Sequence, residues 1–191
     1  DLLEKLELVL DEEEFDPNGG AKDKEAVDSW IRQCQTWKEK YPVVLPKHYE
    51  AGDDEPANVY AAIKEISKRV EEDVITVVGN GSACVVGGHA YEMKKGQRFI
   101  SNSAIASMGY DLPAAIGIWA ASRKDGAYSM GAAREGEDVI LITGDGSIQM
   151  NLQELQTIIH HKMGIKIFII NNGGYHSIRQ TQQSYFKPPL V

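Results

Sequence analysis

The chain has 191 residues, 42% of them hydrophobic, and a net charge of −8, as expected for one ordinary domain with a short appendage. This charge disfavours nucleic acid or an anionic membrane as partner, and no apolar run approaches the ~18 residues of a membrane span. Two cysteines, Cys34 and Cys84, are too few for a disulfide framework or a cysteine-zinc site, and no signal peptide opens the sequence, which together predict a cytoplasmic location.

The N-terminal part is expected to be separate from the main domain. Residues 1–10 carry leucines on one helical face but start in mid-pattern, so we expect the sequence to be part of a longer polypeptide. Residues 11–22 are acidic and rich in Gly and Pro, which is typical of a linker or loop. Residues 23–40 have helical periodicity, with Trp30 and Trp37 as core or interface anchors.

From residue 55 onward the pattern alternates between helix and strand. The predicted helices cover a stripe from Val59 to Val70, then 84–93, 111–122 and 152–163. The predicted strands are 74–78, 99–100, 139–143 and 165–170, and the Gly-rich segment 123–137 is expected to be a surface insertion. Because the strands are apolar throughout and alternate with helices, the sequence predicts an α/β domain: a three-layer αβα arrangement with a mainly parallel sheet.

Three of the strand ends carry unusual loops. They read Gly79-Asn80-Gly81-Ser82, Gly144-Asp145-Gly146-Ser147 and Asn171-Asn172-Gly173-Gly174. Ligands of open parallel sheets bind beyond the carboxyl ends of the strands, and small residues let the backbone approach a phosphate. A carboxylate and a carboxamide at the same place are hard oxygen ligands suited to Mg²⁺. The loops therefore predict a metal-bridged diphosphate at this edge of the sheet.

The spacing between two of these loops is characteristic. The GDG of residues 144–146 and the NN of residues 171–172 are separated by 24 residues (147–170), which is room for one helix and one strand. This pattern resembles the thiamine-diphosphate signature. The stretch from Ser107 to Gly117, SMGYDLPAAIG, is similar to the MGxxLPAAIG stretch of acetolactate synthases and related 2-keto acid enzymes, and residues 178–182 resemble the end of their NN-loop motif.

The resemblance implies a thiamine-diphosphate-binding fold and a domain division. Residues 1–22 would be the end of a preceding central domain plus a linker, and residues 23–191 the diphosphate-binding domain, truncated at its C-terminus. The cofactors implied are thiamine diphosphate and Mg²⁺, and it stays open whether FAD binds elsewhere in the full-length protein. The activating glutamate is expected outside this chain, on a pyrimidine-binding domain of the same or a partner subunit. A homodimer or homotetramer is expected.

The resemblance also assigns roles to individual residues. Asp145, the Asn172 side chain and the Gly174 carbonyl would bind Mg²⁺, and the Met108 side chain would hold the cofactor in a bent shape. The Ala106 carbonyl would accept a hydrogen bond from the pyrimidine amine. The remaining cofactor-binding positions would be Asn80, Gly81, Ser82, Gly144, Gly146, Ser147 and Tyr175.

The activity implied is decarboxylation of a pyruvate-like 2-keto acid, followed by ligation of the resulting enamine to a second carbonyl. The residues after NN depart from the acetolactate synthase pattern, since residues 175–178 read Tyr-His-Ser-Ile. Another thiamine-diphosphate decarboxylase or a sugar-related carboligase is therefore an alternative, and so is a non-catalytic phosphate- or nucleotide-binding regulatory domain. Simpler interpretations also stay open: Asp145 as a helix cap, Met108 as core filler, His176 as a structural loop residue, and His160 and His161 on a solvated face.

Overall fold

A computed structural model describes residues 24–52, 54–122 and 139–186. The predicted helix at 1–10, the linker at 11–22 and the insertion at 123–137 lie outside these ranges. The chain divides into two compact units, Asp1–Pro42 and Val43–Val191. The predicted boundary at residue 22 stays a prediction. The described part of the first unit is helix α2, Lys24–Lys40, on which Trp30 and Trp37 are 60% and 45% exposed and contact each other edge to face. Of the two predicted roles, core or interface anchor, the exposure excludes the first, and the second stays a prediction.

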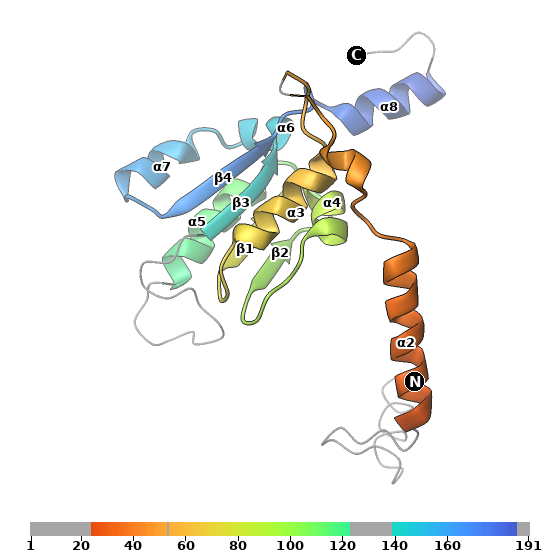
Figure 1. Cartoon of the computed structure of the whole chain (residues 1–191). Coiled ribbons are helices and arrows are strands. Elements are labelled where there is room, and N and C mark those ends of the chain that lie inside the picture. The colour runs from red at the N-terminus through yellow and green to blue at the C-terminus, as the bar shows by residue number, and fades with distance from the viewer. Residues whose placement is uncertain (1–23, 53, 123–138, 187–191) are drawn as a thin grey trace, which may run out of the picture. The chain divides into compact units, whose positions relative to one another are not determined.

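The second unit is built on four strands that are all parallel. They are β1 (Ile75–Val78), β2 (Arg98–Ser101), β3 (Val139–Gly144) and β4 (Ile165–Ile170), and they lie in the order β2-β1-β3-β4. Helices lie on both faces of the sheet (Figure 1). The predicted three-layer α/β fold is confirmed, and each predicted strand is found within two residues of its expected bounds.

The helices follow from local sequence signals. They are η1 (Pro46–Tyr49), α3 (Val59–Arg69), α4 (Ser82–Ala90), α5 (Asp111–Ser122), α6 (Asp145–Gln149), α7 (Glu154–His160) and α8 (His176–Tyr185). Helix α3 begins after Asn58, whose side-chain oxygen accepts a hydrogen bond from the Tyr60 amide at 3.0 Å, as an N-cap should. Helix α5 has the predicted bounds. Helices α6 and α8 were not expected from the pattern, and α7 is shorter than the predicted helix at 152–163.

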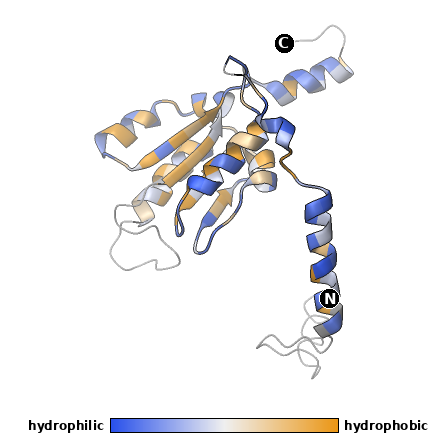
Figure 2. Cartoon of the chain, in the orientation of Figure 1, coloured by the Kyte–Doolittle hydropathy of each residue, from blue (hydrophilic) through white to orange (hydrophobic). Residues whose placement is uncertain are grey.

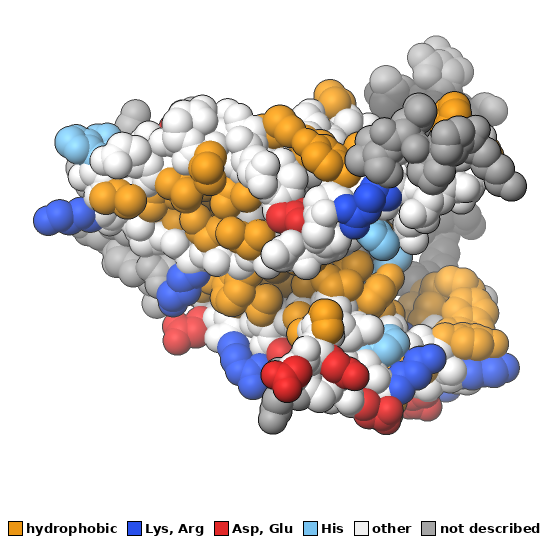
Figure 3. Space-filling view, turned by 90° about the horizontal axis from the view of Figure 1, so that it is seen from above, with side chains coloured by type: hydrophobic (Ala, Val, Ile, Leu, Met, Phe, Trp, Pro, Cys, Tyr) orange, Lys and Arg blue, Asp and Glu red, His pale blue; other side chains and the backbone are white. Residues whose placement is uncertain are grey.

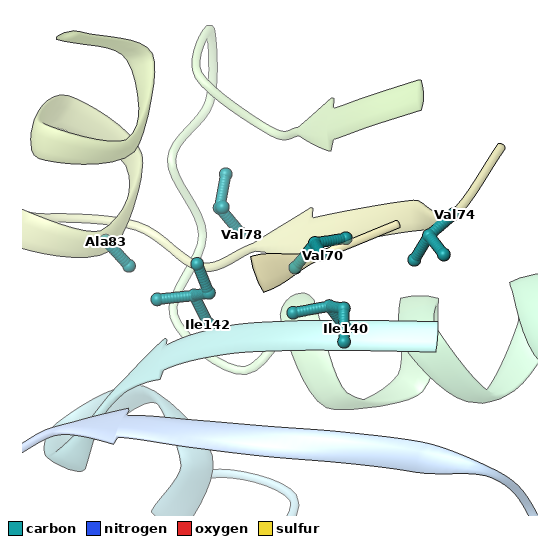
Figure 4. Packing of buried hydrophobic residues seen from close by; sticks show 6 residues of the cluster. All are labelled: Val70, Val74, Val78, Ala83, Ile140 and Ile142. Atoms are coloured by element: carbon teal, nitrogen blue, oxygen red, sulfur yellow. The ribbon is translucent and has the colours of Figure 1, made fainter. Parts of the chain in front are cut away.

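The core lies on both faces of the two central strands. Neighbouring residues of a strand point to opposite faces, so one cluster contains Val78, Ile140 and Ile142, and the other contains Val77 and Leu141. Figure 4 shows the first cluster, in which the side chains of β1 and β3 converge with those of α4 and the end of α3. Hydropathy follows this arrangement, since hydrophobic residues gather in the strands whereas α2 and α8 are largely hydrophilic (Figure 2).

The two edge strands are less well covered than the central pair. Strand β1 is buried throughout and β3 nearly so, but β4 consists of half-buried and exposed residues, and Ile169 is 52% exposed. The three-layer arrangement predicted from the sequence would cover β4 on both faces. The difference arises because β4 is the edge of the sheet formed by the described residues and lacks a neighbour on its outer side.

Candidate diphosphate and metal site

The carboxyl ends of β1, β3 and β4 meet at one edge of the sheet, because these strands are parallel neighbours. An open cleft of about 540 Å³, a volume that includes solvent, lies at this edge. Figure 3 shows the molecule from above, with hydrophobic side chains gathered in and around a hollow and charged ones mostly toward its rim. The cleft therefore lies where ligands of parallel α/β sheets bind.

Most of the predicted site residues line this cleft. The ten that do so are Asn80, Gly81, Ser82, Met108, Gly144, Asp145, Gly146, Ser147, Asn172 and Tyr175. The other two are bonded to them: the Ala106 carbonyl accepts a hydrogen bond from Asn80 Nδ2 at 3.2 Å, and the Gly174 amide donates to Asp145 Oδ2 at 2.7 Å. Residues about 90 positions apart in the chain thus surround one cleft, as the strand-end argument requires.

The Asp145 carboxylate and the Asn172 amide form the polar centre of the site. Asp145 follows β3 directly, and both its oxygens accept backbone hydrogen bonds, Oδ1 from Gly146 at 2.8 Å and Oδ2 from Gly174 at 2.7 Å. Asn172 Oδ1 is buried and has no hydrogen-bond partner among the residues that the structure describes. A buried acceptor is normally paired, and an anionic carboxylate with an unpartnered amide oxygen in one cleft suits a hard cation such as Mg²⁺. The residues present therefore fit the implied metal.

The helix-cap interpretation of Asp145 does not account for all of its contacts, because one of them lies outside its own helix. Gly144 is the N-cap of α6, and Asp145 is its first residue. Its carboxylate joins this helix to the loop after β4 through Gly174, which a cap confined to its own helix would not do. Among the described residues, no group of three His, Cys, Asp or Glu side chains could hold a metal. A metal here would need amide, carbonyl or ligand oxygens beside Asp145.

The loop after β4 has a strained backbone that is fastened from α8. Gly173, Gly174 and Tyr175 all have positive φ angles, of 76°, 78° and 51°, a region that non-glycine residues such as Tyr175 rarely occupy. Arg179 donates from Nη1 to the Gly173 carbonyl at 2.5 Å and from Nη2 to the Asn172 carbonyl at 3.0 Å. Sequence reasoning missed this role of Arg179. In the sequence, Arg179 is a basic residue seven positions after Asn172, on a helix that is mostly polar and has no buried residues.

A second missed feature is a buried carboxylate behind the cleft. Asp111, at the start of α5, is fully buried, and its oxygens accept hydrogen bonds from the Thr143 hydroxyl and the Leu112 amide. A Cβ atom on Gly79 would overlap Asp111 Oδ2. Thr143 lies two residues before Asp145, and Gly79 directly precedes Asn80. Asp111 therefore bonds the end of β3 to α5 and packs against the loop after β1.

The structure also places the methionine and the three histidines that the sequence singled out. Met108 is half-buried, lines the cleft and is absent from the hydrophobic clusters of the described residues, which disfavours the core-filler interpretation. His176 also lines the cleft but is exposed, and its chemical role stays untested. His160 and His161 are exposed at the end of α7, as predicted.

Fold and cleft together define a phosphate-binding α/β domain of the kind that holds a diphosphate beyond the ends of its strands. Residues 79–189 match the family described as "Thiamine pyrophosphate enzyme, C-terminal TPP binding domain". This chain belongs to that family, and the matched segment begins at the first cleft loop. No described helix is long and apolar enough to cross a membrane.

Known relatives are acetolactate synthases. The chain is 34% identical over 164 residues to the acetolactate synthase large subunit of Cyanidium caldarium, which covers 86% of this chain and 25% of that protein. It is 32% identical to the large subunit of Porphyra purpurea, over 85% of this chain and 24% of that protein. The large subunit of acetolactate synthase isozyme 3 of Escherichia coli (strain K12) is 25% identical over 97% of this chain and 28% of its own length. The chain thus spans about a quarter of these relatives.

Proposed function

We propose that this chain holds the diphosphate end of thiamine diphosphate through Mg²⁺, as part of an acetolactate synthase-like enzyme. The observation that carries the proposal is the unpartnered, buried Asn172 Oδ1 in the same cleft as the oriented Asp145 carboxylate. Asp145, Asn172 and the Gly174 carbonyl are the proposed metal ligands. When bound, the cofactor supplies the electron sink for decarboxylation of a 2-keto acid.

The chain's own residues would bind and orient the cofactor. Helix α4 begins at Ser82 after Gly81, which has a positive φ of 60° and no capping side chain, so its first amides are free for phosphate oxygens. Small residues at 144, 146 and 147 let the backbone approach the diphosphate. Met108 lines the same cleft, and its side chain would hold the cofactor in a bent shape. The Ala106 carbonyl would accept a hydrogen bond from the pyrimidine amine of the cofactor.

The proposed substrate is a pyruvate-like 2-keto acid, with ligation to a second carbonyl. This rests on the printed activity of the relatives, acetolactate synthase. The cleft wall formed by Tyr175, His176, Ser177 and Ile178 differs from the pattern that the resemblance leads one to expect, which favours a different keto acid or acceptor as the second candidate. A pyrimidine-binding domain and a homo-oligomer are part of the same proposal. FAD binding and a cytoplasmic location stay predictions.

Isothermal titration calorimetry of thiamine diphosphate with and without Mg²⁺ tests the metal and diphosphate site. Asp145→Ala should weaken Mg²⁺-dependent binding by more than about 100-fold and Asn172→Ala by at least about tenfold, because second-layer changes alone cost 10- to 100-fold. Asn58→Ala is the matched control: the Asn58 side chain accepts one hydrogen bond from the Tyr60 amide at the start of α3 and does not line the cleft. It should stay within about threefold of wild type.

Two outcomes would contradict the proposal. Unchanged affinity in both Asp145→Ala and Asn172→Ala would remove the metal site from this cleft. Binding by the wild type that is indifferent to Mg²⁺ and to EDTA would mean that the diphosphate is held without a metal. The substrate is a separate question, answered by supplying the active enzyme with pyruvate and other 2-keto acids and identifying the products.

A further inference from the structure

Both backbone polar groups of Gly109 are held by side chains from the segment after β3. Its amide donates a hydrogen bond to Ser147 Oγ at 2.9 Å, and its carbonyl accepts one from Asn151 Nδ2 at 2.6 Å. Ser147 is buried in α6, and Asn151 is half-buried in the turn that follows. Ser147 thus holds the peptide between residues 108 and 109, Asn151 holds the peptide between residues 109 and 110, and both lie about 40 positions away in the chain.

The fit around Gly109 is also steric. Gly109 is buried with a φ of 82°, where a side chain is strained. A Cβ atom there would lie 2.7 Å from Met150 Cβ and 2.8 Å from Asn151 Nδ2. The loop therefore packs tightly against the turn after α6, with no room for a side chain at residue 109. This packing restricts movement of the Gly109 backbone while Met150 and Asn151 stay in place.

The residue before Gly109 is Met108, whose side chain reaches into the cleft. A Cβ atom on Gly146 would lie 3.1 Å from Met108 Cε, so the end of the methionine is close to the loop that follows β3. Within the described ranges no hydrogen bond orients the Met108 side chain, and its backbone adjoins the Gly109 amide that Ser147 holds. Asn151 does not line the cleft but is bonded to the Gly109 carbonyl. An effect of Asn151 on a bound cofactor would therefore pass through the Gly109 backbone.

We infer that Asn151 is a positioning residue that, together with Ser147, fixes the backbone on both sides of the Gly109 Cα and thereby sets the place of the Met108 side chain against the cofactor. The inference rests on the proposed function, because Met108 is there assigned to the cofactor. Ser147 lines the cleft and has a proposed diphosphate role, so its substitution would mix two effects. Asn151 does not line the cleft, so its substitution tests the positioning effect alone.

Methyl NMR of the full 191-residue chain labelled with [¹³C-methyl]methionine reads the place of Met108 directly. Met108→Leu assigns the resonance, and Met93 and Met163 report on the rest of the chain. In the wild type, thiamine diphosphate with Mg²⁺ should move the Met108 methyl signal, because it would lie beside the cofactor rings. In Asn151→Ala that movement should fall by at least about half at saturating ligand, while the dissociation constant stays within about threefold.

Asn58→Ala is the matched control, since it also removes one hydrogen bond between an asparagine side chain and the backbone, at the start of α3. It should leave the Met108 response at the wild-type value. In the active enzyme, Asn151→Ala should lower kcat as Met108→Ala does, and the double variant should be no slower than Met108→Ala alone, because both act through one side chain. If Asn151→Ala does not fold, Asn151→Asp replaces it, since it keeps the shape and loses the Nδ2 donor.

A wild-type Met108 response in Asn151→Ala would overturn the inference, and so would fully multiplicative losses of kcat in the double variant. Failure of the proposed function looks different: the wild type would then show neither calorimetric binding nor a Met108 response to the ligand. Even in that case, spectra recorded without ligand test whether the hydrogen bond from Asn151 to the Gly109 carbonyl positions Met108. Asn151→Ala should move the Met108 signal and leave those of Met93 and Met163 in place.

Discussion

The buried carboxylate behind the cleft allows a quantitative prediction on Thr143. Asp111 and Thr143 are both fully buried, and the threonine hydroxyl is one of two hydrogen-bond donors to the carboxylate, the other being the Leu112 amide. Thr143→Val keeps the side-chain shape but removes this donor. A hydrogen bond to a charged group is worth about 1.5–3 kcal/mol, and a buried charge that loses a partner costs more. We expect the free energy of unfolding to fall by about 2–3 kcal/mol.

The assay is urea denaturation of the chain followed by far-UV circular dichroism, with the slope m checked for constancy. Thr157→Val is the matched control, because Thr157 Oγ1 also donates to a carboxylate, Glu154 Oε2 at 2.9 Å, but at a half-exposed position where water can replace it. It should cost less than about 1 kcal/mol. Equal losses in the two valine variants would refute the reasoning.

A double-mutant cycle then separates the hydrogen bond from general packing. In an Asp111→Ala background the carboxylate is gone, so Thr143→Val should cost less than about 0.5 kcal/mol more. The coupling energy between the two positions should be about 1.5–3 kcal/mol, the difference between the two costs. A coupling near zero would mean that the hydroxyl and the carboxylate contribute independently, against the contact that the structure shows.

Two further predictions concern the cofactor. Met108→Ala should lower turnover by about tenfold while cofactor affinity changes less than about threefold, because Met108 supplies orientation; paired kinetics and calorimetry check this, and a loss of thermal stability alone would support the core-filler interpretation instead. The 191 residues by themselves should release no CO₂ from pyruvate in the presence of thiamine diphosphate and Mg²⁺, and robust release would contradict the two-domain site.

Much of the fold could be predicted because its signals are local. The strands at 139–143 and 165–170 are mostly apolar runs, and α5 has the bounds of its small-residue segment. Helix α8 was missed because HSIRQTQQSY is mostly polar and none of its residues is buried in the structure. Helix α6 is five residues long and contains Gly146, which gives it no periodic pattern at all.

The residues that line the cleft could be predicted from the topology of the sheet. The hydrogen bonds behind the cleft, which hold its loops in place, could not. Parallel neighbouring strands bring their carboxyl ends together whatever the side chains are, so Asn80, Asp145 and Asn172 had to meet. The contact between Asn151 and Gly109 spans 42 positions, and that between Thr143 and Asp111 spans 32. Such pairs depend on how one loop packs on another, and neither hydropathy nor spacing carries a signal for them.

The expected inactivity of the isolated chain follows from which charged groups reach the cleft. Among the described residues, the titratable side chains that line it are Asp145, Tyr175 and His176, of which only Asp145 is a carboxylate. Both Asp145 oxygens are committed to backbone amides and to the proposed metal, and Asp111 is sealed from solvent by its own hydrogen bonds. No described carboxylate is therefore free to move a proton at the pyrimidine end of the cofactor.

The open side of the cleft also exposes an apolar side chain. Ile178 lines the cleft and is 45% exposed, as expected of a surface that a second domain covers. Adding the pyrimidine-binding domain should both bury this surface and restore CO₂ release, whereas added Mg²⁺ or cofactor alone should do neither.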